Sequence, residues 1–385
     1  MNLPDGWKIV KLGDIATKIG SGITPKGGRA VYQKKGVPII RSQNVLWGNL
    51  SLDDVARITI EQHQKMKSTL VKENDILLNI TGASIGRCCF VPKGTEESNV
   101  NQHVCIIRLD RTNYPKYILD TLLSFQGQRQ IALFQAGGNR QGLNFEQIAS
   151  IELKVPSFPE QKAIADLLST WDAAIEKTEQ LITAKEKQFQ WLLDELITKP
   201  SKSGKWKNQQ LSNLCDIVKG QQLNVENMTD CGQYYALNGG VSPSGRTNRW
   251  NTPENTITIS EGGNSCGFVN FNTDKFWAGG HCYVLLNVEE KSIDVKYLFH
   301  YLKLKEPKIM KLRVGSGLPN IQKKDIDAYP VLLPQLQIQA GIAKILDLYR
   351  SEINLLLTIL NKYKHQKCGL MRNLLNGQWR LKEFK

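Results

Sequence analysis

The stretch EQKAIADLLSTWDAAIEKTEQLITAKEKQFQWLLDELIT at residues 160–198 decides the fold, because it runs for 39 residues without a proline or glycine. A second stretch of equal length, IQAGIAKILDLYRSEINLLLTILNKYKHQKCGLMRNLLN at 338–376, also lacks proline. At 1.5 Å per residue, each stretch predicts one helix of about 58 Å. A helix of that length exceeds one small core, so each must extend beyond a single domain.

Both stretches repeat apolar residues at alternating spacings of four and three, the pattern of a and d positions in a coiled coil. A solvated single helix would not keep such a seam for more than four heptads, so we expect the two helices to pack on each other. Two unrelated helices packed on separate domains remain the alternative. The predicted seam residues are Ile164, Leu168, Trp171, Ile175, Ile182, Phe189, Leu192, Leu196, Ile342, Leu346, Tyr349, Ile353, Leu356, Leu360, Tyr363, Leu370 and Leu374.

The two helices belong to an internal repeat, since a shift of 178 residues aligns Gln161 with Gln339 and Leu168 with Leu346. DGWKIVKL at 5–12 and SGKWKNQQL at 203–211 each open a repeat, whereas the similar NGQWRL at 376–381 stands near the end. The prediction is therefore a domain at 1–158, a helix at 159–200, a second domain at 201–336, and a helix with a tail at 337–385. In this effectively circular repeat, NGQWRL would take beside domain one the place that SGKWKNQQL takes beside domain two. Three tryptophans would be structural anchors: Trp7, Trp206 and Trp379.

Length and charge favour two globular domains that bind a polyanion. The chain has 385 residues and a formal net charge of +14, from 50 Lys and Arg against 36 Asp and Glu. Basic folded domains of this kind most often present a positive face to nucleic acid, although charge can also serve solubility alone. The sequence has no apolar run of about 18 residues and no export signal. Eight cysteines without CxxC spacing fit a reducing cytoplasm, which is the expected location.

Each domain is predicted to be mixed α+β. VPIIRSQNV, DILLNITGASIGRCCFV and VCIIRL are typical of strands separated by turns, and YPKYILDTLLSF has helical spacing. Segments of the second domain correspond to these: TGASIG at 81–86 to GGNSCG at 262–267, and NQHVCII at 101–107 to GGHCYVL at 279–285. The core is thus duplicated, while the polar residues of the loops differ.

Polar residues cluster in these loops and are the candidates for DNA contact. Arg, Asn and Gln can read guanine and adenine edges, while Lys, Ser and Thr suit phosphates, although any one of them can be an ordinary turn residue. The candidates of the first domain are Ser21, Thr24, Lys26, Arg29, Arg41, Ser42, Gln43, Asn44, Thr81, Ser84, Asn101, Gln102, His103, Asn139, Arg140 and Gln141. Those of the second domain are Gln221, Asn238, Ser242, Ser244, Arg246, Thr247, Arg249, Asn264, Ser265, His281, Ser316, Asn320 and Lys323.

No catalytic residues are predicted. The glycine-rich stretches GSGITPKGG, TGASIG and SEGGNSCG lack the spacing of nucleotide-binding loops, and no nuclease, methylase or hydrolase motif is present. Cys88 and Cys89 lie in an apolar run and are predicted to be core residues. No metal site is expected, because the scattered His281, Cys282 and Cys266 lack finger spacing.

VPSFPEQKAIADLLSTWDAAI and VLLPQLQIQAGIAKILDLYRSEI each end a domain and enter a long helix. With GDIATKIGSGITPKG, DILLNITGASIG and NVNQHV, they make nearly the whole chain resemble type I restriction-modification specificity subunits. At the second junction, Gln337, Ile338 and Gln339 replace Pro159, Glu160 and Gln161. The resemblance implies two target recognition domains joined by two antiparallel coiled-coil helices with a pseudo-twofold repeat.

The resemblance also implies that each domain reads one half of a bipartite, asymmetric duplex DNA target, with the helices setting the spacer. The partners would be two methyltransferase subunits, which form an adenine-N6 methylase, and restriction subunits, which add an ATP-dependent translocase and nuclease. S-adenosylmethionine, ATP and Mg²⁺ would bind to those partners, and this chain would be non-catalytic. The alternatives are a specificity component of another restriction class and a coiled-coil scaffold with basic binding domains.

Overall fold

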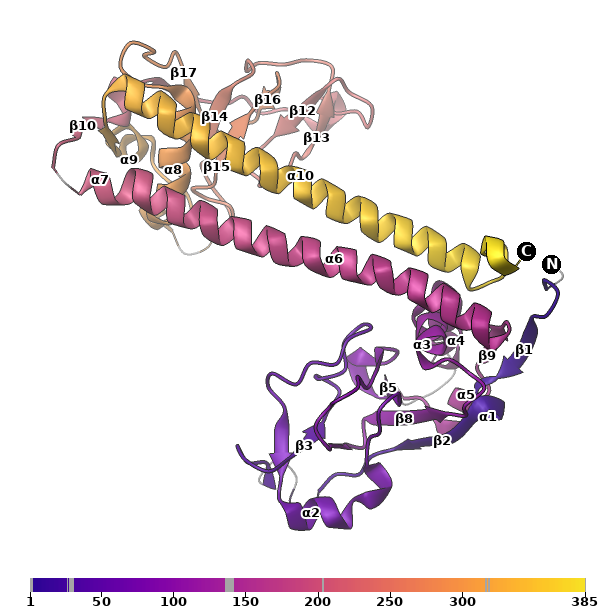
Figure 1. Cartoon of the computed structure of the whole chain (residues 1–385). Coiled ribbons are helices and arrows are strands. Elements are labelled where there is room, and N and C mark those ends of the chain that lie inside the picture. The colour runs from indigo at the N-terminus through magenta and orange to yellow at the C-terminus, as the bar shows by residue number, and fades with distance from the viewer. Residues whose placement is uncertain are drawn as a thin grey trace. The chain divides into compact units, whose positions relative to one another are not determined.

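The computed structural model describes residues 3–25, 27, 31–135, 142–202, 204–315, 317 and 319–384. The chain divides into two compact units: unit 1, Met1–Thr178 with Ile359–Lys385, and unit 2, Glu179–Thr358. Two long helices, α6 (Phe158–Leu193) and α10 (Leu336–Leu374), contribute residues to both units (Figure 1). Each boundary between the units therefore falls within a continuous helix.

Unit 1 is built on an antiparallel four-stranded sheet with the strand order β2-β8-β5-β6. A three-stranded sheet, β4-β3-β7, and a two-stranded ladder of β1 and β9 complete it. The strands are β1 (Lys8–Lys11), β2 (Ala16–Ser21), β3 (Val37–Ile40), β4 (Ala56–Ile58), β5 (Ile76–Asn79), β6 (Cys88–Phe90), β7 (Asn99–Val100), β8 (Val104–Leu109) and β9 (Glu152–Val155). The shorter helices are α1 (Leu12–Ile15), α2 (Ile60–Lys65), α3 (Pro115–Leu123), α4 (Phe125–Gln135) and α5 (Phe145–Ala149).

Unit 2 repeats this topology with the strand orders β11-β17-β14-β15, β13-β12-β16 and β10-β18. The predicted α+β class and the internal repeat are therefore confirmed. The strands are β10 (Lys207–Gln210), β11 (Asp216–Lys219), β12 (Tyr234–Leu237), β13 (Gly245–Thr247), β14 (Thr256–Ser260), β15 (Val269–Asn272), β16 (Trp277–Ala278), β17 (Cys282–Leu286) and β18 (Pro330–Leu333). The helices are α7 (Lys199–Ser201), α8 (Val295–Ile309) and α9 (Lys323–Asp327).

The central strands β5 and β8 are mostly apolar and buried because both faces of the four-stranded sheet are covered. Side chains alternate between the faces, so Ile76 and Leu78 of β5 join one core cluster while Leu77 joins another. Cys88 and Cys89 follow the same alternation and are fully buried on opposite faces. Burial raises the pKa of Cys89 to about 12, which identifies this thiol as a core group.

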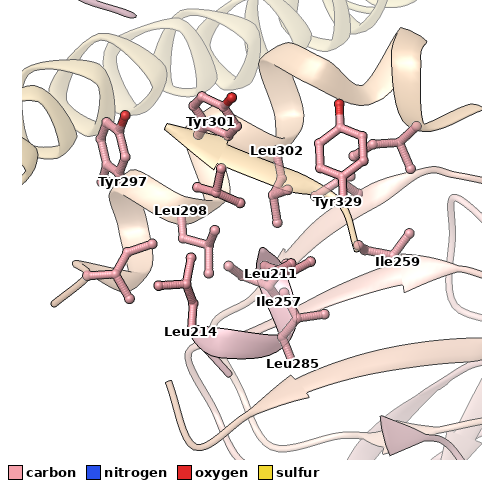
Figure 2. Packing of buried hydrophobic residues seen from close by; sticks show 14 of the residues in the cluster. Leu211, Leu214, Ile257, Ile259, Leu285, Tyr297, Leu298, Tyr301, Leu302 and Tyr329 are labelled. Atoms are coloured by element: carbon pink, nitrogen blue, oxygen red, sulfur yellow. The ribbon is translucent and has the colours of Figure 1, made fainter. Parts of the chain in front are cut away.

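In unit 2 the apolar face of α8 packs on the corresponding sheet. Figure 2 shows Leu298 and Leu302 of α8 directed toward the sheet residues Ile257 and Leu285. Tyr297 of α8 is fully buried and donates its hydroxyl hydrogen bond to Leu332 O (2.7 Å), as Tyr117 of α3 does to Lys154 O (2.7 Å). Tyr117 and Tyr297 are therefore equivalent residues. Each connects a helix by a hydrogen bond to the strand that precedes the long helix of its unit.

A buried glutamine joins each globular part to the helix that follows it. Gln161 accepts a hydrogen bond from Tyr114 N (2.8 Å) and donates to Pro156 O (3.0 Å). Gln339 accepts from Asp294 N (3.0 Å) and donates to Pro334 O (2.9 Å). These hydrogen bonds explain why both junctions have glutamine at this position, although Pro159 and Glu160 of the first junction are Gln337 and Ile338 in the second.

The long helices pack against each other in antiparallel directions within each unit. In unit 1, the rings of Trp171 and Tyr363 are 5.7 Å apart, and Lys367 forms an ion pair with Asp172. In unit 2, Lys185 forms an ion pair with Glu352 (2.8 Å). Every predicted seam residue is buried or half-buried.

Helix α6 changes its buried face near its C-terminal end. A π-helical turn at Asp194–Thr198 follows α6, and a π turn holds more residues than an α turn. Leu193, just before this turn, and Ile197 within it are buried, whereas the predicted seam residues Leu192 and Leu196 are only half-buried. The regular heptad pattern cannot anticipate this shift of one position.

The C-terminal tail packs within unit 1, but not in the predicted place. In unit 1, β1 directly follows Trp7 and pairs with β9. In unit 2, β10 directly follows Trp206 and pairs with β18 in the same way. NGQWRL instead lies against the N-terminus, where a Cβ added to Gly377 would come within 2.8 Å of Pro4 Cγ. The role predicted for Trp379 is wrong, since its side chain is 55% exposed, whereas Trp7 is buried.

We expect Gln339→Ala to lower the free energy of unfolding of unit 2 by about 2 kcal/mol, because it leaves buried backbone groups without partners. Gln161→Ala should have a similar effect on unit 1. Urea unfolding measures both changes, with the exposed Gln188→Ala on α6 as the control. An unchanged unfolding midpoint for both variants would contradict the role assigned to these glutamines.

The buried Asp120 of α3 should make the stability of unit 1 depend on pH. Desolvation raises the pKa of Asp120 to about 6, against the opposing charge of Lys116. A raised pKa means that the stability this group provides is present below about pH 4 and lost as the pH rises through about 6, with an upper bound of about 3 kcal/mol. Asp120→Asn should therefore stabilise unit 1 at pH 7.5 but not at pH 4 in urea unfolding. An equal difference at both pH values, with exposed Asp53→Asn as the control, would refute this.

Candidate nucleic-acid interface

The candidate loops of unit 1 meet at one end of its sheets. We call them the loop cluster of unit 1: residues 21–25, 41–44, 80–86 and 101–103. Backbone hydrogen bonds join loops that are distant in the sequence: Gly22 N to Asn101 O (3.1 Å), Asn101 N to Ile40 O (3.0 Å), and Ile80 N to His103 O (3.0 Å). Most of the described candidates of the first domain are therefore neighbours in space.

The loop cluster of unit 2, residues 219–222, 238–244, 261–267 and 279–281, has the same framework. Three hydrogen bonds occur at equivalent positions in the two units. They are Gly22 N to Val104 O (3.3 Å) and Gly220 N to Cys282 O (2.9 Å); Ile80 N to His103 O (3.0 Å) and Glu261 N to His281 O (2.8 Å); and Leu143 N to Ile80 O (2.9 Å) and Ile321 N to Glu261 O (2.8 Å).

A buried polar side chain at the end of each central strand also fixes a loop. Asn79 Nδ2 of β5 donates to Ser42 O (2.9 Å), and Ser260 Oγ of β14 donates to Gly239 O (2.5 Å). Both side chains are buried, so they hold the loop from beneath and leave its outer surface free. The loops are thus positioned by backbone and buried groups.

Two glycines are required where the loops approach most closely. A Cβ on Gly22 would lie 1.8 Å from Val100 O, and one on Gly220 would lie 2.3 Å from Gly279 O. No side chain fits at those distances, so both positions require glycine for space. The corresponding stretches TGASIG and GGNSCG also share positive φ angles, at Gly82 (71°) and Gly86 (89°) and at Gly263 (76°) and Gly267 (88°).

The described candidates differ in exposure. The exposed ones are Thr24 and Gln43 in unit 1, and Gln221, Ser242, Ser244, Arg246, Arg249, Asn264, His281, Asn320 and Lys323 in unit 2. The half-buried ones are Ser21, Arg41, Ser42, Thr81, Ser84, Gln102, His103, Asn238 and Ser265. Lys26, Arg29, Asn139, Arg140, Gln141 and Ser316 lie outside the described residues.

Three candidates are buried and serve the loops themselves. Asn44 is 3% exposed and spends its side chain on Arg41 N (3.0 Å) and Ser51 O (3.0 Å). Asn101 and Thr247 are buried too, and Asn101 Oδ1 accepts from His103 N (3.1 Å). The prediction that these three contact DNA directly is corrected to a positioning role, because their side chains face the interior.

In unit 1 the ring of His103 is held between two polar side chains. Its Nδ1 lies 2.6 Å from Thr81 Oγ1, and its Nε2 lies 2.7 Å from Gln102 Nε2. The three residues come from two loops and form one half-buried polar surface. Donors and acceptors are thus presented together, as base recognition requires.

In unit 2 the corresponding His281 faces a carboxylate. Glu261 Oε1 accepts a hydrogen bond from Lys219 Nζ (2.6 Å), and Glu261 Oε2 lies 3.6 Å from His281 Nδ1. Neither Lys219 nor Glu261 was among the predicted contacts. The signal was present in the alignment of SEGGNSCG with NITGASIG, where Glu261 stands opposite Ile80.

The described part of the chain offers neither a group of ligands for a metal ion nor a membrane-spanning helix. Within it, no three His, Cys, Asp or Glu side chains are grouped so that they could hold a metal ion. No helix in the same residues is long and apolar enough to cross a membrane.

The described chain is thus a duplicated α+β module with a polar loop cluster in each unit and two long helices. The model of the family described as the type I restriction modification DNA specificity domain matches residues 4–185 and 203–365. The chain therefore belongs to this family, and both copies of the repeat carry the domain.

Individual relatives agree with this assignment. A Mycoplasma pneumoniae protein named as a type I specificity subunit is 33% identical over 187 residues, covering 46% of this chain and 49% of that protein. The chain thus spans about half the length of this relative. A protein of Methanocaldococcus jannaschii, named as the MjaX specificity subunit, is 25% identical over 99% of this chain and 95% of its own length. The crystal structure of a type I S subunit from M. genitalium shares the fold, with a TM-score of 0.72 and 18% identity over 97% of this chain and 98% of that one.

We expect Asn79→Ala to loosen the loop at residues 41–45, since Ser42 O loses its buried donor. Hydrogen exchange of the amides of this loop should become faster, and unit 1 should lose about 1–3 kcal/mol of stability. Asn49→Ala, which changes an exposed asparagine nearby, is the control. Unchanged exchange in the Asn79 variant would show that the backbone alone positions the loop.

Proposed function

We propose that this chain is the DNA-specificity subunit of a type I restriction-modification complex and that each unit reads one half of a bipartite, asymmetric duplex target. The observation that carries the proposal is one backbone framework used twice with different side chains. Ser21 and Ile80 in unit 1 correspond to Lys219 and Glu261 in unit 2, while His103 and His281 are the same residue type. Two such readers would recognise two different short sequences. The net charge of +14 supports binding to phosphates.

We further propose that α6 and α10 set the number of unspecified base pairs between the two half-sites. Helices of 36 and 39 residues are rigid spacers of about 54 and 58 Å. Packing between them within each unit resists bending. Fixed separation of half-sites by a rigid protein element is the usual way in which two-site readers select a spacer.

The chemistry in this proposal belongs to partner subunits. Two methyltransferase subunits would carry S-adenosylmethionine and methylate adenine N6, one for each unit of the repeat. Restriction subunits would add ATP, Mg²⁺ and DNA translocation. The complex would act in the cytoplasm, and this chain would contribute recognition and assembly without catalysing a step.

Methylation mapping tests the proposal. Cells that express this chain with its methyltransferase subunit should acquire adenine methylation at one split motif, with two short specified blocks around a fixed gap. Cells that lack this chain should not. An assembled complex that leaves methylation unchanged would overturn the proposal and favour the scaffold alternative. Binding to duplex DNA that does not weaken with salt would do the same.

Deleting one heptad from each long helix should shorten the preferred spacer and leave both half-sites unchanged. A whole heptad preserves the packing face of each helix, so the units should still fold. The mapped motif is again the measurement, and a shuffled heptad of unchanged length that keeps the apolar positions is the control. A change in the specified bases instead of the gap would refute the spacer role.

A further inference from the structure

The loop clusters carry different chemistry at two equivalent positions. Ser21 and Lys219 end matching strands, opposite Cys105 of β8 and Tyr283 of β17, and each is followed by a close-approach glycine. Ile80 and Glu261 make the same backbone hydrogen bonds, to His103 O and His281 O respectively. Unit 2 thus replaces a serine and an isoleucine with a lysine and a glutamate.

The carboxylate of Glu261 is held firmly and only partly solvated. Its main chain bridges two loops, donating to His281 O (2.8 Å) and accepting from Ile321 N (2.8 Å). The side chain is 14% exposed, while those of Lys219 and His281 are 52% and 61% exposed. The carboxylate is therefore more buried than the two side chains that face it, Lys219 and His281.

One oxygen of this carboxylate is available as an acceptor. Oε1 is used by Lys219, but among the described residues no full hydrogen bond is donated to Oε2. His281 Nδ1 lies 3.6 Å from it, and the neighbouring Tyr283 hydroxyl donates to Ile321 O (2.9 Å). The negative charge of Glu261 also affects the neighbouring Tyr283. Burial, and then the charge of Glu261, raise the pKa of Tyr283 to about 12. An ion pair with a half-exposed lysine adds little to stability, so folding alone does not account for the carboxylate.

The framework does not need this carboxylate, because Ile80 occupies the same position in unit 1 with the same backbone bonds. In a surface meant for a polyanion, an acidic group weakens binding unless it accepts a specific hydrogen bond. The exocyclic amino group of cytosine is the donor that glutamate reads in the major groove. Lys219 offsets the repulsion between the carboxylate and the phosphates.

We propose that Glu261 accepts a hydrogen bond from the N4 amino group of a cytosine and so specifies one C·G pair in the half-site read by unit 2. This inference rests on the proposed function. Lys219 orients the carboxylate through its hydrogen bond to Oε1, and His281 Nδ1 lies 3.6 Å from Oε2. The equivalent position in unit 1, with Ile80, specifies no cytosine in this way.

Methylation mapping with variants of Glu261 in the assembled complex tests this inference. Glu261→Ile, which installs the residue of unit 1, should remove the requirement for cytosine at one position of one half-site, with about a tenfold loss of discrimination. Glu261→Gln keeps the shape, and its amide pairs with adenine, so adenine should be admitted at that position. Glu290→Gln, an exposed carboxylate beyond the other end of β17, is the control and should leave the motif unchanged.

Each outcome decides a different point. A split motif that is identical in wild type and in both Glu261 variants overturns the inference but leaves the two-reader function standing. Relaxation across the whole half-site also overturns it, since that would mean Glu261 only shapes the loops. If the wild-type complex assembles and gives no split motif, the proposed function fails first. Should Glu261→Ile fail to assemble, the isosteric Glu261→Gln carries the same comparison.

Discussion

A buried glutamine at the start of each long helix is the constraint on which the rest of each unit depends. Gln161 and Gln339 satisfy the backbone at the point where a strand ends, a short helix begins and a long helix leaves the domain. No apolar side chain could occupy either site without leaving buried N–H and C=O groups unpaired. The same bonds in both units fix how each globular part is attached to its helix.

Around that attachment, the polar contacts of the two units have diverged. In unit 1, α3 meets the long helices through Lys116 and Asp120 together with Asp172. In unit 2, α8 uses Lys296 and His300 against Asp347 (2.7 and 2.8 Å). The loop clusters show the same division, since glycines and backbone bonds are shared while exposed side chains differ. A framework held by the main chain leaves the surface free to change without loss of fold.

The tail shows how a repeat can be closed without a covalent bond. In unit 2, the chain runs from the end of α6 through Trp206 into β10. In unit 1, the equivalent strand β1 starts near the N-terminus, so the end of α10 reaches it only by contact. Gly377 packs on Pro4 and Trp7, and Arg380 forms a bidentate ion pair with the buried Glu160 (3.0 and 2.8 Å). These non-covalent contacts take the place of the continuous chain that connects α6 to β10 in unit 2.

The sequence by itself determined the two long helices, the α+β class and the repeat, because heptad spacing, strand alternation and the matching segments of its two halves are properties of the chain alone. Tertiary structure decided which polar loop residues face outward. Asn44, Asn101 and Thr247 read like ordinary contact residues, yet they are buried, because their partners come from the folding of the loops. Glu261 became a candidate only when strand pairing placed it between Lys219 and His281, which lie 42 residues before it and 20 after it. The local sequence pattern determines whether a segment forms a helix or a strand. The orientation and the neighbours of a loop side chain depend instead on strands that are far away in the sequence.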